Sequence, residues 1–373
     1  MSDEEILRLK DFYFSLPKEL IAQYPLERRD ESKLLVRDYS GAISNNYTKN
    51  LADLLPENSL IVVNDSKVFP SRILGELKSG GKVEIFLLEP MESINESNVW
   101  KSIGKPFKKL RPGTIIDLYN GCVAKIESHN SDKSTGTPTF NVKFNLLGED
   151  FNTWLEHHGY IPLPPYIERK NPKPALQSDD SEIYQTIYAK NRGSVAAPTA
   201  GFHFTGELLN KLSKKNISIV PVTLHVGAGT FLPVKTENIS DHKMHEERYF
   251  IPQSTYRKLL YAKHKSRMII AVGTTTLRCL ESFFSCEVSS KYKHNTNCWN
   301  KTDIFIRPNK KTDTYKPAFI NALMTNFHQP ESTLFMLISA LLGLEEARRV
   351  YNYAIIKKYR FFSYGDSCLF WLT

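Results

Sequence analysis

Cysteine is sparse in this chain, and its spacing matches no disulfide or metal-binding pattern. The five cysteines of the 373-residue sequence are scattered without a C-x-x-C pair, which argues against both a disulfide framework and a zinc site. His242 and His245 form an H-x-x-H spacing, but no third-ligand pattern of a known type accompanies them. We therefore expect no bound metal and a reducing, cytoplasmic setting.

Long hydrophobic runs are also missing. The longest apolar stretch, 334–342, contains Ser339 and is much shorter than the roughly 20 residues that a membrane-spanning helix needs. The first residues are acidic and show no apolar core of a secretion signal. We expect a soluble protein with no membrane partner.

The glycine motifs of common nucleotide-binding proteins are absent as well. The loop around Gly227 and Gly229 lacks the third glycine of G-x-G-x-x-G, and no Walker A sequence occurs, so ATP or NAD binding is not supported. An S-adenosylmethionine-dependent RNA methyltransferase would carry an acidic-Gly-x-Gly loop after its first strand. The chain has none.

What is present indicates a globular protein with a moderately basic surface. Hydrophobic residues make up 41% and charged residues 24% of the chain, which is typical of a folded domain. The length allows two domains, or one large domain with an insertion. A net charge of +9 gives weak support for a polyanionic partner such as nucleic acid.

Residues 67–147 differ from the rest of the chain in their pattern of hydrophobic and turn residues. Short β-rich runs separated by tight turns predict an antiparallel barrel-like or sandwich domain, inserted into a large α/β domain made of 1–66 and 148–373. The expected strands of the insertion are 73–77, 83–88, 100–103, 115–118, 123–126 and 140–144.

Strands and helices alternate in the remainder, which predicts a large mixed α/β domain, either barrel-like or an open sheet. The expected strands are 33–37, 60–64, 217–224, 268–272, 303–306 and 322–325. The expected helices are 151–158 closed by Gly159 as a C′ residue, 206–215, 254–265, 275–284, a helix between Ser332 and Gly343, and 345–358.

Two loops, 193–205 and 222–231, place small residues around a single histidine, His203 or His225. Small residues let the backbone approach a ligand closely, and an imidazole can exchange a proton near neutral pH. An isolated histidine in such a loop is more often a satisfied core residue. Because two such loops lie about 20 residues apart, we expect them to form two walls of one pocket.

Three further segments, 62–72, 272–281 and 325–333, also follow predicted strands. The first could be an ordinary Asx-turn, and in the second Arg278 and Glu281 could form no more than a surface ion pair. Ligands bind where strand ends meet helix starts in α/β sheets. We therefore expect four of the five loops to open on one edge of the sheet.

Several stretches of the sequence are specific enough to indicate a family. Prominent among them are LIAQYP at 20–25, IPLPPYI at 161–167, VAAPTAGFHFT at 195–205, TLHVGAGTF at 223–231 and TNFHQPESTL at 325–334. In these stretches, and from about residue 11 to 370, the chain closely resembles the S-adenosylmethionine:tRNA ribosyltransferase-isomerases of queuosine biosynthesis. Phe202 stands where the family more often has leucine.

The resemblance implies a reaction and its partners. The ribosyl group of S-adenosylmethionine is transferred to 7-aminomethyl-7-deazaguanine in the wobble position of tRNA, giving epoxyqueuosine-tRNA, adenine and methionine. S-adenosylmethionine is then a co-substrate, and no cofactor is bound permanently. We expect a monomer. The alternatives are an RNA methyltransferase and a non-catalytic RNA-binding protein, which would leave the strand-end histidines without a purpose.

That reaction needs a base next to the sulfonium and a proton or hydrogen-bond donor for the departing adenine. The candidates for these catalytic roles are His203, His225, His328, Asp65 and Glu281, and the sequence does not say which is the base. The candidates for substrate binding are Thr199, Gly201, Phe202, Gly227, Gly229, Thr230, Arg278, Asn326 and Asp366, with Phe202 offering the sulfonium an aromatic face. The candidates for tRNA binding are Lys67, Arg72 and Lys82.

Overall fold

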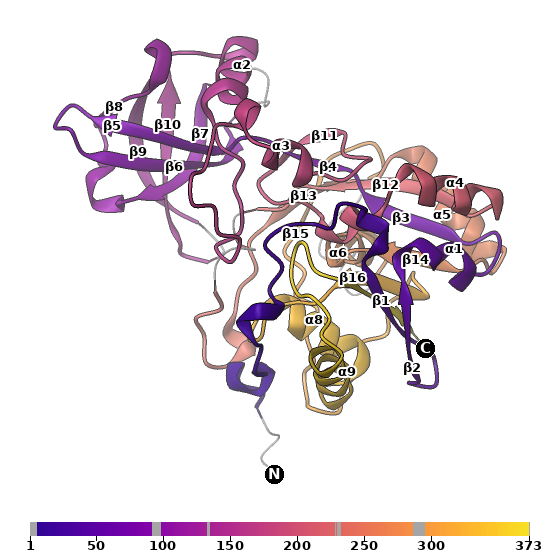
Figure 1. Cartoon of the computed structure of the whole chain (residues 1–373). Coiled ribbons are helices and arrows are strands. Elements are labelled where there is room, and N and C mark those ends of the chain that lie inside the picture. Colours follow the sequence, from indigo (N-terminus) through magenta and orange to yellow (C-terminus); the bar gives the residue numbers. More distant parts are fainter. Residues whose placement is uncertain are drawn as a thin grey trace.

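The computed structural model describes residues 6–91, 98–132, 135–227, 229, 233–285 and 295–372. Two bodies are visible in Figure 1: a large sheet covered by helices, and a smaller closed barrel connected to it. A two-stranded parallel ribbon, β4 (Ser66–Val68) with β11 (Asn191–Ser194), accompanies them. No helix of the described part combines the length and apolar character needed to span a membrane.

The large sheet is open and has nine strands in the order β15-β13-β12-β3-β14-β16-β17-β1-β2. Its centre, β12-β3-β14-β16, is parallel, and antiparallel pairs join β13 to β12 and β17 to β16. In the same order, the strands are Asn300–Thr302, Glu247–Phe250, Ser218–Leu224, Leu60–Asn64, Ile269–Val272, Ala322–Asn326, Ser367–Trp371, Lys33–Arg37 and Ile43–Tyr47.

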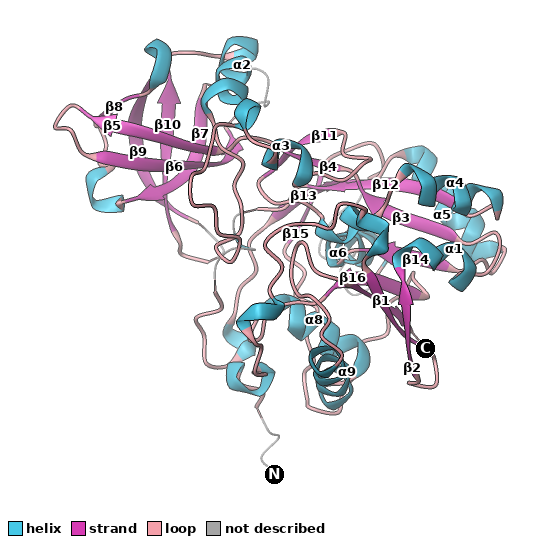
Figure 2. Cartoon of the chain, viewed as in Figure 1, coloured by secondary structure: helices cyan, strands magenta, loops and turns pink. Residues whose placement is uncertain are grey.

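Helices cover both faces of this sheet, because alternate side chains of each strand point to opposite sides. Ile61 and Ile270 pack with the helices α1 (Leu51–Leu54) and α4 (Gly206–Lys214) on one face. On the other face, the neighbouring strand residues pack with α5 (Gln253–His264), α6 (Thr274–Phe284), α8 (Thr333–Leu342) and α9 (Leu344–Ile356). Figure 2 shows this layered arrangement.

The predicted helix boundaries around α8 are confirmed. The Ser332 hydroxyl accepts a hydrogen bond from the backbone N–H of Phe335, so it caps the first turn. Gly343 ends the helix with φ +85°, a conformation that glycine adopts without steric cost.

The smaller body is a closed antiparallel barrel in the order β10-β7-β6-β5-β8-β9. All six strands predicted between 67 and 147 are present, as Arg72–Leu77 (β5), Lys82–Pro90 (β6), Val99–Lys105 (β7), Ile115–Asp117 (β8), Val123–Ser131 (β9) and Pro138–Phe144 (β10). Trp100 and Phe140 fill the interior, and Phe151 and Trp154 of α2 (Gly148–His158) pack against it. We propose that 67–147 form one domain inserted between 1–66 and 148–373, with α2 covering the barrel from beyond that boundary.

The predicted strand at 303–306 is wrong. Edge strand β15 covers only Asn300–Thr302, and residues 303–308 have no regular structure. The backbone groups of Ile304 bond to side chains instead of a neighbouring strand: its N–H donates to Thr302 Oγ1 and its carbonyl accepts from Arg278 Nε. Strands β2, β4, β11, β13 and β17 were not anticipated from the sequence. The short helix α3 (Asp180–Ile183) lies in the loop that follows α2.

Gly159 directly follows α2, but it is not the left-handed C′ residue that the sequence suggested. Its φ is −76°, so its backbone suits any residue. The reason for glycine is close packing, since a Cβ at this position would lie 2.6 Å from the carbonyl oxygens of both Leu155 and Pro70.

We expect Gly159→Ala to lower the stability of the protein by about 2 kcal/mol, because backbone atoms of α2 and the 67–71 segment would have to separate. Thermal unfolding measures the change. The matched control is Gly206→Ala at the start of α4, where a Cβ meets nothing within 4 Å, and which should be neutral or slightly stabilising. Equal melting temperatures for the two variants would contradict this account of the α2 contact.

Candidate active site

The carboxyl ends of β12, β3, β14 and β16 meet at one edge of the sheet, because these strands are parallel. Asn64, at the end of β3, ties the loops together. Its side-chain nitrogen donates to Leu224 O at 3.0 Å and to Thr275 Oγ1 at 3.2 Å, and its oxygen accepts from the backbone N–H of Leu224 and Ser66. The loops that follow β3, β12 and β14 are therefore held side by side.

Asp65 lies in the middle of this edge and is 5% exposed. Its carboxylate accepts from Thr223 Oγ1 at 2.6 Å and from Asn191 Nδ2 at 3.0 and 3.1 Å. Its carbonyl oxygen accepts the backbone N–H groups of Lys190 and Asn191. Burial raises the pKa of Asp65, and the Thr223 and Asn191 hydrogen bonds offset part of that rise.

His225 contacts the residue that follows Asp65 in the chain, since its Nδ1 is 2.9 Å from the Ser66 hydroxyl. Its ring stacks on Trp299 with centroids 4.8 Å apart, and the guanidinium of Arg248 covers the same indole at 5.1 Å. Burial lowers the pKa of His225 to about 4, with a further lowering by the charge of Arg248. The imidazole is therefore neutral at pH 7.

Gly193 leaves room for the other nitrogen of that ring. A Cβ at Gly193 would lie 2.6 Å from His225 Nε2, and the residue has φ +149°. Loop 193–205 therefore contacts the loop of His225, and that the two loops form the walls of one pocket stays a prediction.

His203 is fixed by hydrogen bonds at both ring nitrogens. Its Nδ1 is 2.7 Å from Ser32 Oγ, and its Nε2 is 3.2 Å from the Asn326 side-chain nitrogen, which also donates to Phe362 O. An amide nitrogen only donates, so Nε2 is the acceptor and Nδ1–H is the donor to Ser32. Burial lowers the pKa of His203 to about 3. Neither nitrogen is free in this arrangement to take a further proton.

Asn326, at the end of β16, connects His203 to the shared edge, and Thr199 Oγ1 donates to its side-chain oxygen at 3.4 Å. Asp366 supports the same region from the C-terminal turn. Its carboxylate accepts the backbone N–H groups of Lys33 and Arg360. Burial raises the pKa of Asp366. Both side chains are held by protein groups, and Asn326 helps to position His203.

Arg278 pairs with Glu247, not with Glu281 as the ion-pair alternative supposed. Its Nη1 donates to Glu247 Oε2, and the other oxygen of Glu247 accepts the backbone N–H of Gly227 at 3.0 Å. Arg278 is 6% exposed. Through Glu247 it therefore holds the backbone of Gly227 in place.

Glu281 and His328 form their hydrogen bonds with residues outside the Asp65 group. Glu281 lies six residues after Thr275 on α6, about 9 Å further along the helix, where it accepts from Tyr315 OH and the backbone N–H of Ala318. Burial raises its pKa. His328 Nε2 is 3.1 Å from Thr325 Oγ1, and burial lowers its pKa to about 3.

The small and aromatic residues of the two loops differ in how closely neighbouring side chains approach them. A Cβ at Gly201 would lie 2.1 Å from Tyr188 OH, and one at Gly229 would lie 2.4 Å from His245 Cδ2, so both glycines accommodate neighbouring side chains. Phe202 is buried between Tyr184 and Tyr364, with Arg29 over its ring at 5.4 Å. Among the described glycines of the two loops, Gly227 has the most space, because the nearest described atom to a Cβ there, Glu247 Cγ, would be 4.0 Å away.

The three predicted tRNA-contacting cations do not gather. Arg72 forms an ion pair with Glu84 at 2.6 Å. Lys82 is opposite Glu76 in the register of the β5–β6 hairpin, four residues along the strand from Arg72, which places it about 13 Å from Arg72. Lys67 lies on β4 at the junction of the two bodies. Thr230 falls outside the described residues. Among the described residues, no group of three His, Cys, Asp or Glu side chains could hold a metal ion.

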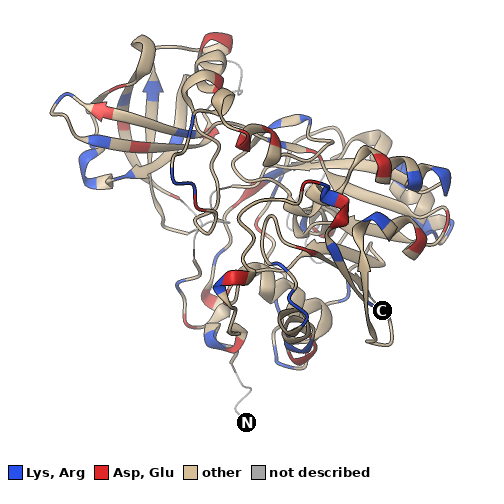
Figure 3. Ribbon diagram, viewed as in Figure 1, with Lys and Arg blue, Asp and Glu red and all other residues tan. Residues whose placement is uncertain are grey.

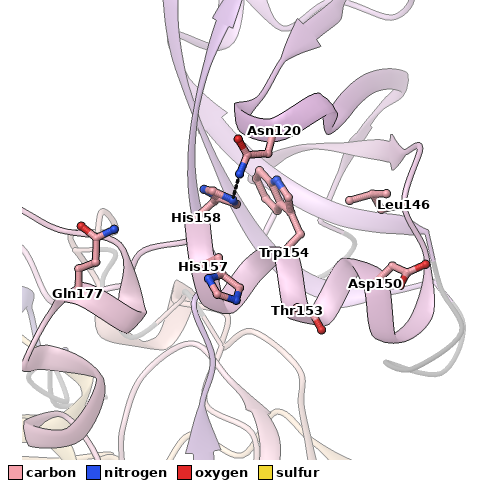
Figure 4. A pocket seen from close by; sticks show the side chains of 8 residues that line it. All are labelled: Asn120, Leu146, Asp150, Thr153, Trp154, His157, His158 and Gln177. Atoms are coloured by element: carbon pink, nitrogen blue, oxygen red, sulfur yellow. Dashed lines mark hydrogen bonds between the residues drawn. The ribbon is translucent and has the colours of Figure 1, made fainter.

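A hollow of about 430 Å³ lies elsewhere, between α2 and the barrel (Figure 4). Trp154, His157 and His158 line it, and Asn120 donates to His158 across it. None of the candidate site residues borders it. The strand-end edge, not this hollow, carries the predicted site.

Comparison with known proteins gives the family. A model of the family described as queuosine biosynthesis protein matches residues 9–370. The chain belongs to this family. A relative from Treponema denticola named S-adenosylmethionine:tRNA ribosyltransferase-isomerase is 44% identical over 361 residues, which cover 96% of this chain and 99% of that protein. A relative of the same name from Clostridioides difficile is 41% identical, covering 97% and 99%.

A solved structure supports the same relationship. The crystal structure of an S-adenosylmethionine tRNA ribosyltransferase from Thermotoga maritima is 29% identical, with a TM-score of 0.51. The match covers 96% of this chain and 99% of that one. The family's fold, a mixed α/β body with a closed six-stranded barrel, is therefore the fold of this chain.

Several residues at this queuosine-family edge were missed by reasoning from the sequence. They share a polar or aromatic side chain that becomes adjacent to a candidate only through folding: Ser32, Ser66, Asn191, Thr223, Glu247 and Trp299. Ser66 and Thr223 were within reach, since they stand in the segments 62–72 and 222–231 that the sequence already singles out. The others lie outside the segments singled out there.

We expect Gly193→Ala to displace the His225 ring from Trp299, because the new Cβ would overlap Nε2. Tryptophan emission should shift, and the shift should vanish in a Trp299→Phe background. Gly113→Ala is the control, since Gly113 has φ +87° but a Cβ there meets nothing within 4 Å. Unchanged emission in a folded Gly193→Ala protein would show that the two loops do not confine His225.

We expect acid to destabilise the protein partly through His328. Its folded pKa of about 3 lies below the ordinary value of 6.5, so the unfolded chain binds the extra proton between these pH values. Stability therefore falls as pH drops, by about 1.4 kcal/mol per unit for one such group. Thermal unfolding of His328→Gln between pH 7 and 5 should show a flatter slope than wild type, whereas the exposed-site control His264→Gln should not.

Proposed function

We propose that this chain is an S-adenosylmethionine:tRNA ribosyltransferase-isomerase. It transfers the ribosyl group of S-adenosylmethionine to 7-aminomethyl-7-deazaguanine in the wobble position of tRNA and releases adenine and methionine. The observation that carries this proposal is the match to relatives of that name over 96–97% of the chain at 40–44% identity. S-adenosylmethionine is a co-substrate, and no permanently bound cofactor is required.

The electrostatics of the strand-end edge suit a sulfonium substrate. The pKa values of His203 and His225 are lowered to about 3 and about 4, so both rings are neutral at pH 7 and do not repel a positive charge. The Asp65 carboxylate supplies negative charge at the same edge. Because few water molecules reach such a buried group, its attraction to the sulfonium is stronger than in solvent.

We assign proton transfer to Asp65 and His225. The reaction needs removal of a proton beside the sulfonium and a hydrogen-bond donor for the departing adenine. A raised pKa makes Asp65 a stronger base than an ordinary aspartate. His225 lies on the neighbouring strand end, and Ser66 fixes its orientation, so it is the proposed donor to adenine.

His203 is proposed as a positioning residue, because both of its nitrogens are already bonded to Ser32 and Asn326. It holds the Asn326 side chain, and through it Thr199, at the edge of the sheet where the strands end. Gly227 is proposed to let the backbone approach the nucleoside, since a ligand could lie where its Cβ would be. Arg278 acts through Glu247 on that loop.

The setting proposed for this enzyme is the cytoplasm, where tRNA is modified. Cys122, Cys279, Cys298 and Cys368 are free thiols, which suits a reducing compartment. We propose that the protein acts as a monomer, which light scattering of the purified chain would test.

Adenine release is the decisive assay. Precursor tRNA carrying the aminomethyl-deazaguanine base is incubated with S-adenosylmethionine labelled in the adenine ring, and free adenine should form with one equivalent of modified tRNA. His225→Gln should lower kcat about 100-fold or more while S-adenosylmethionine affinity stays near that of wild type. His203→Ala should reduce turnover mainly through substrate binding. Absence of adenine with wild-type protein, or methyl transfer in its place, would refute the proposed function.

A further inference from the structure

A second cavity, of about 350 Å³, lies at the junction of the two bodies. Its walls come from β4, α2 and the segment that leads from 161 to 192. This volume is within the range of about 300–1,000 Å³ for pockets that bind small molecules or single ligand groups. None of the residues that line it has been assigned to the proposed catalytic groups above.

The cavity carries an excess of positive charge. Lys67, Lys190 and Arg192 line it against one carboxylate, Glu156. Both lysines are exposed, so they stand at the mouth, while Arg192 lies deeper. Figure 3 shows that Lys and Arg are otherwise spread over both bodies together with Asp and Glu. At this hollow three cations face one lining carboxylate, and the charge of Glu149 also acts on Arg192.

Arg192 is incompletely paired. Its Nη1 donates to Asn152, and its guanidinium lies over the ring of Phe69 at 5.5 Å. Its Nε and Nη2 are buried without a hydrogen bond, although Nη2 lies 3.4 Å from Glu156 Oε1. Buried donors without partners are costly, and an anion in the cavity that Arg192 lines would be attracted by the guanidinium charge.

The other walls are apolar. Val68, Pro70, Ile161 and Leu176 line the cavity beside the cations. Cations next to an apolar surface match a nucleotide, which combines a charged phosphodiester with a sugar and a base that stacks or packs on apolar groups.

The cavity is adjacent to the proposed active site through the backbone. The Lys190 N–H and the Asn191 N–H both donate to the carbonyl of Asp65, and Asn191 also binds the Asp65 carboxylate. On the other strand of the ribbon, Lys67 follows Ser66, the partner of His225. The lining residues Lys67 and Lys190 are therefore directly connected to the two groups assigned to proton transfer. Lys67 is next to Ser66, which contacts His225, and the backbone of Lys190 bonds to Asp65.

We propose that this cavity binds a phosphodiester-linked nucleotide of the tRNA anticodon loop that neighbours the wobble position. Lys67, Lys190 and Arg192 bind its phosphates, and the apolar wall receives its sugar or base. The wobble base must be unstacked to reach the reacting atoms, and holding its neighbour in the cavity would stabilise that state. The inference rests on the proposed function for the identity of the RNA.

The carboxylate of S-adenosylmethionine is the competing source of an anion. A single carboxylate would leave at least one of the three cations without a partner, and the two lysines at the mouth face an incoming polyanion. The observations therefore favour the tRNA backbone, and the experiment separates the two.

The test uses the full-length protein with Lys67→Gln and Lys190→Gln combined. Both lysines are exposed, so folding should be kept, as thermal unfolding can verify. Binding of precursor tRNA is measured by fluorescence anisotropy over a series of salt concentrations, and binding of S-adenosylmethionine by calorimetry. The control, Lys214→Gln with Lys258→Gln on the exposed sides of α4 and α5, removes the same charge away from the cavity.

We expect the cavity variant to bind tRNA about tenfold more weakly than the control, with a salt slope reduced by about 1 to 2 and unchanged S-adenosylmethionine affinity. Affinity and salt slope equal to those of the control would overturn the proposal. Weaker S-adenosylmethionine binding with unchanged tRNA binding would also overturn it and assign the cavity to the co-substrate. Failure of the proposed function is distinct, because it would show as absent adenine release by wild-type protein whatever the tRNA affinities are.

Discussion

Parallel pairing of β12, β3, β14 and β16 is the constraint on which the rest of the structure depends. It brings four carboxyl strand ends to one edge, although the segments that follow them are separated by up to about 260 residues along the chain. The Asn64 side chain then fastens the loops after β3, β12 and β14 to one another. Without that pairing, Asp65, His225 and Asn326 would be unrelated polar residues.

Burial gives this edge its chemical character. Burial disfavours the charged form of a side chain, so it lowers the pKa of an imidazole and raises the pKa of a carboxylate. Both effects occur here on neighbouring strand ends, at His225 and Asp65. The proposed site thereby avoids histidine cations and retains an aspartate, which is the basis for proposing that it receives a positively charged sulfonium. The same burial fixes His203 between Ser32 and Asn326, which makes it part of the scaffold of the site.

The junction between the barrel and the sheet gives the insertion a consequence for function. Side chains of α2 pack into the barrel core, and the opposite side of the same helix contributes Glu156 to the cavity that contains Arg192. The ribbon of β4 and β11 connects this cavity to Asp65 and Ser66. The barrel is thereby linked to the edge of the proposed site by a short, hydrogen-bonded path.

Local patterns were sufficient for much of the fold. The six barrel strands were predicted because alternation and tight turns are short-range signals, and α8 was predicted from Ser332 and Gly343 at its ends. Strand 303–306 was wrong because an apolar run cannot reveal that Arg278 and Thr302 take its backbone hydrogen bonds. β17 was missed because its place between β16 and β1 is set by pairing with distant strands.

The sequence by itself determined the family, the alternation of elements and the loops that carry histidines and small residues, because each of these is written in contiguous residues. Only the tertiary structure decided which polar groups act together: it placed Arg278 with Glu247, moved Glu281 away to Tyr315, and brought Ser32 to His203 and Trp299 to His225. The physical reason is that hydrogen bonds, burial and the pKa values they produce depend on neighbours in space, which a chain acquires only when its strands are paired.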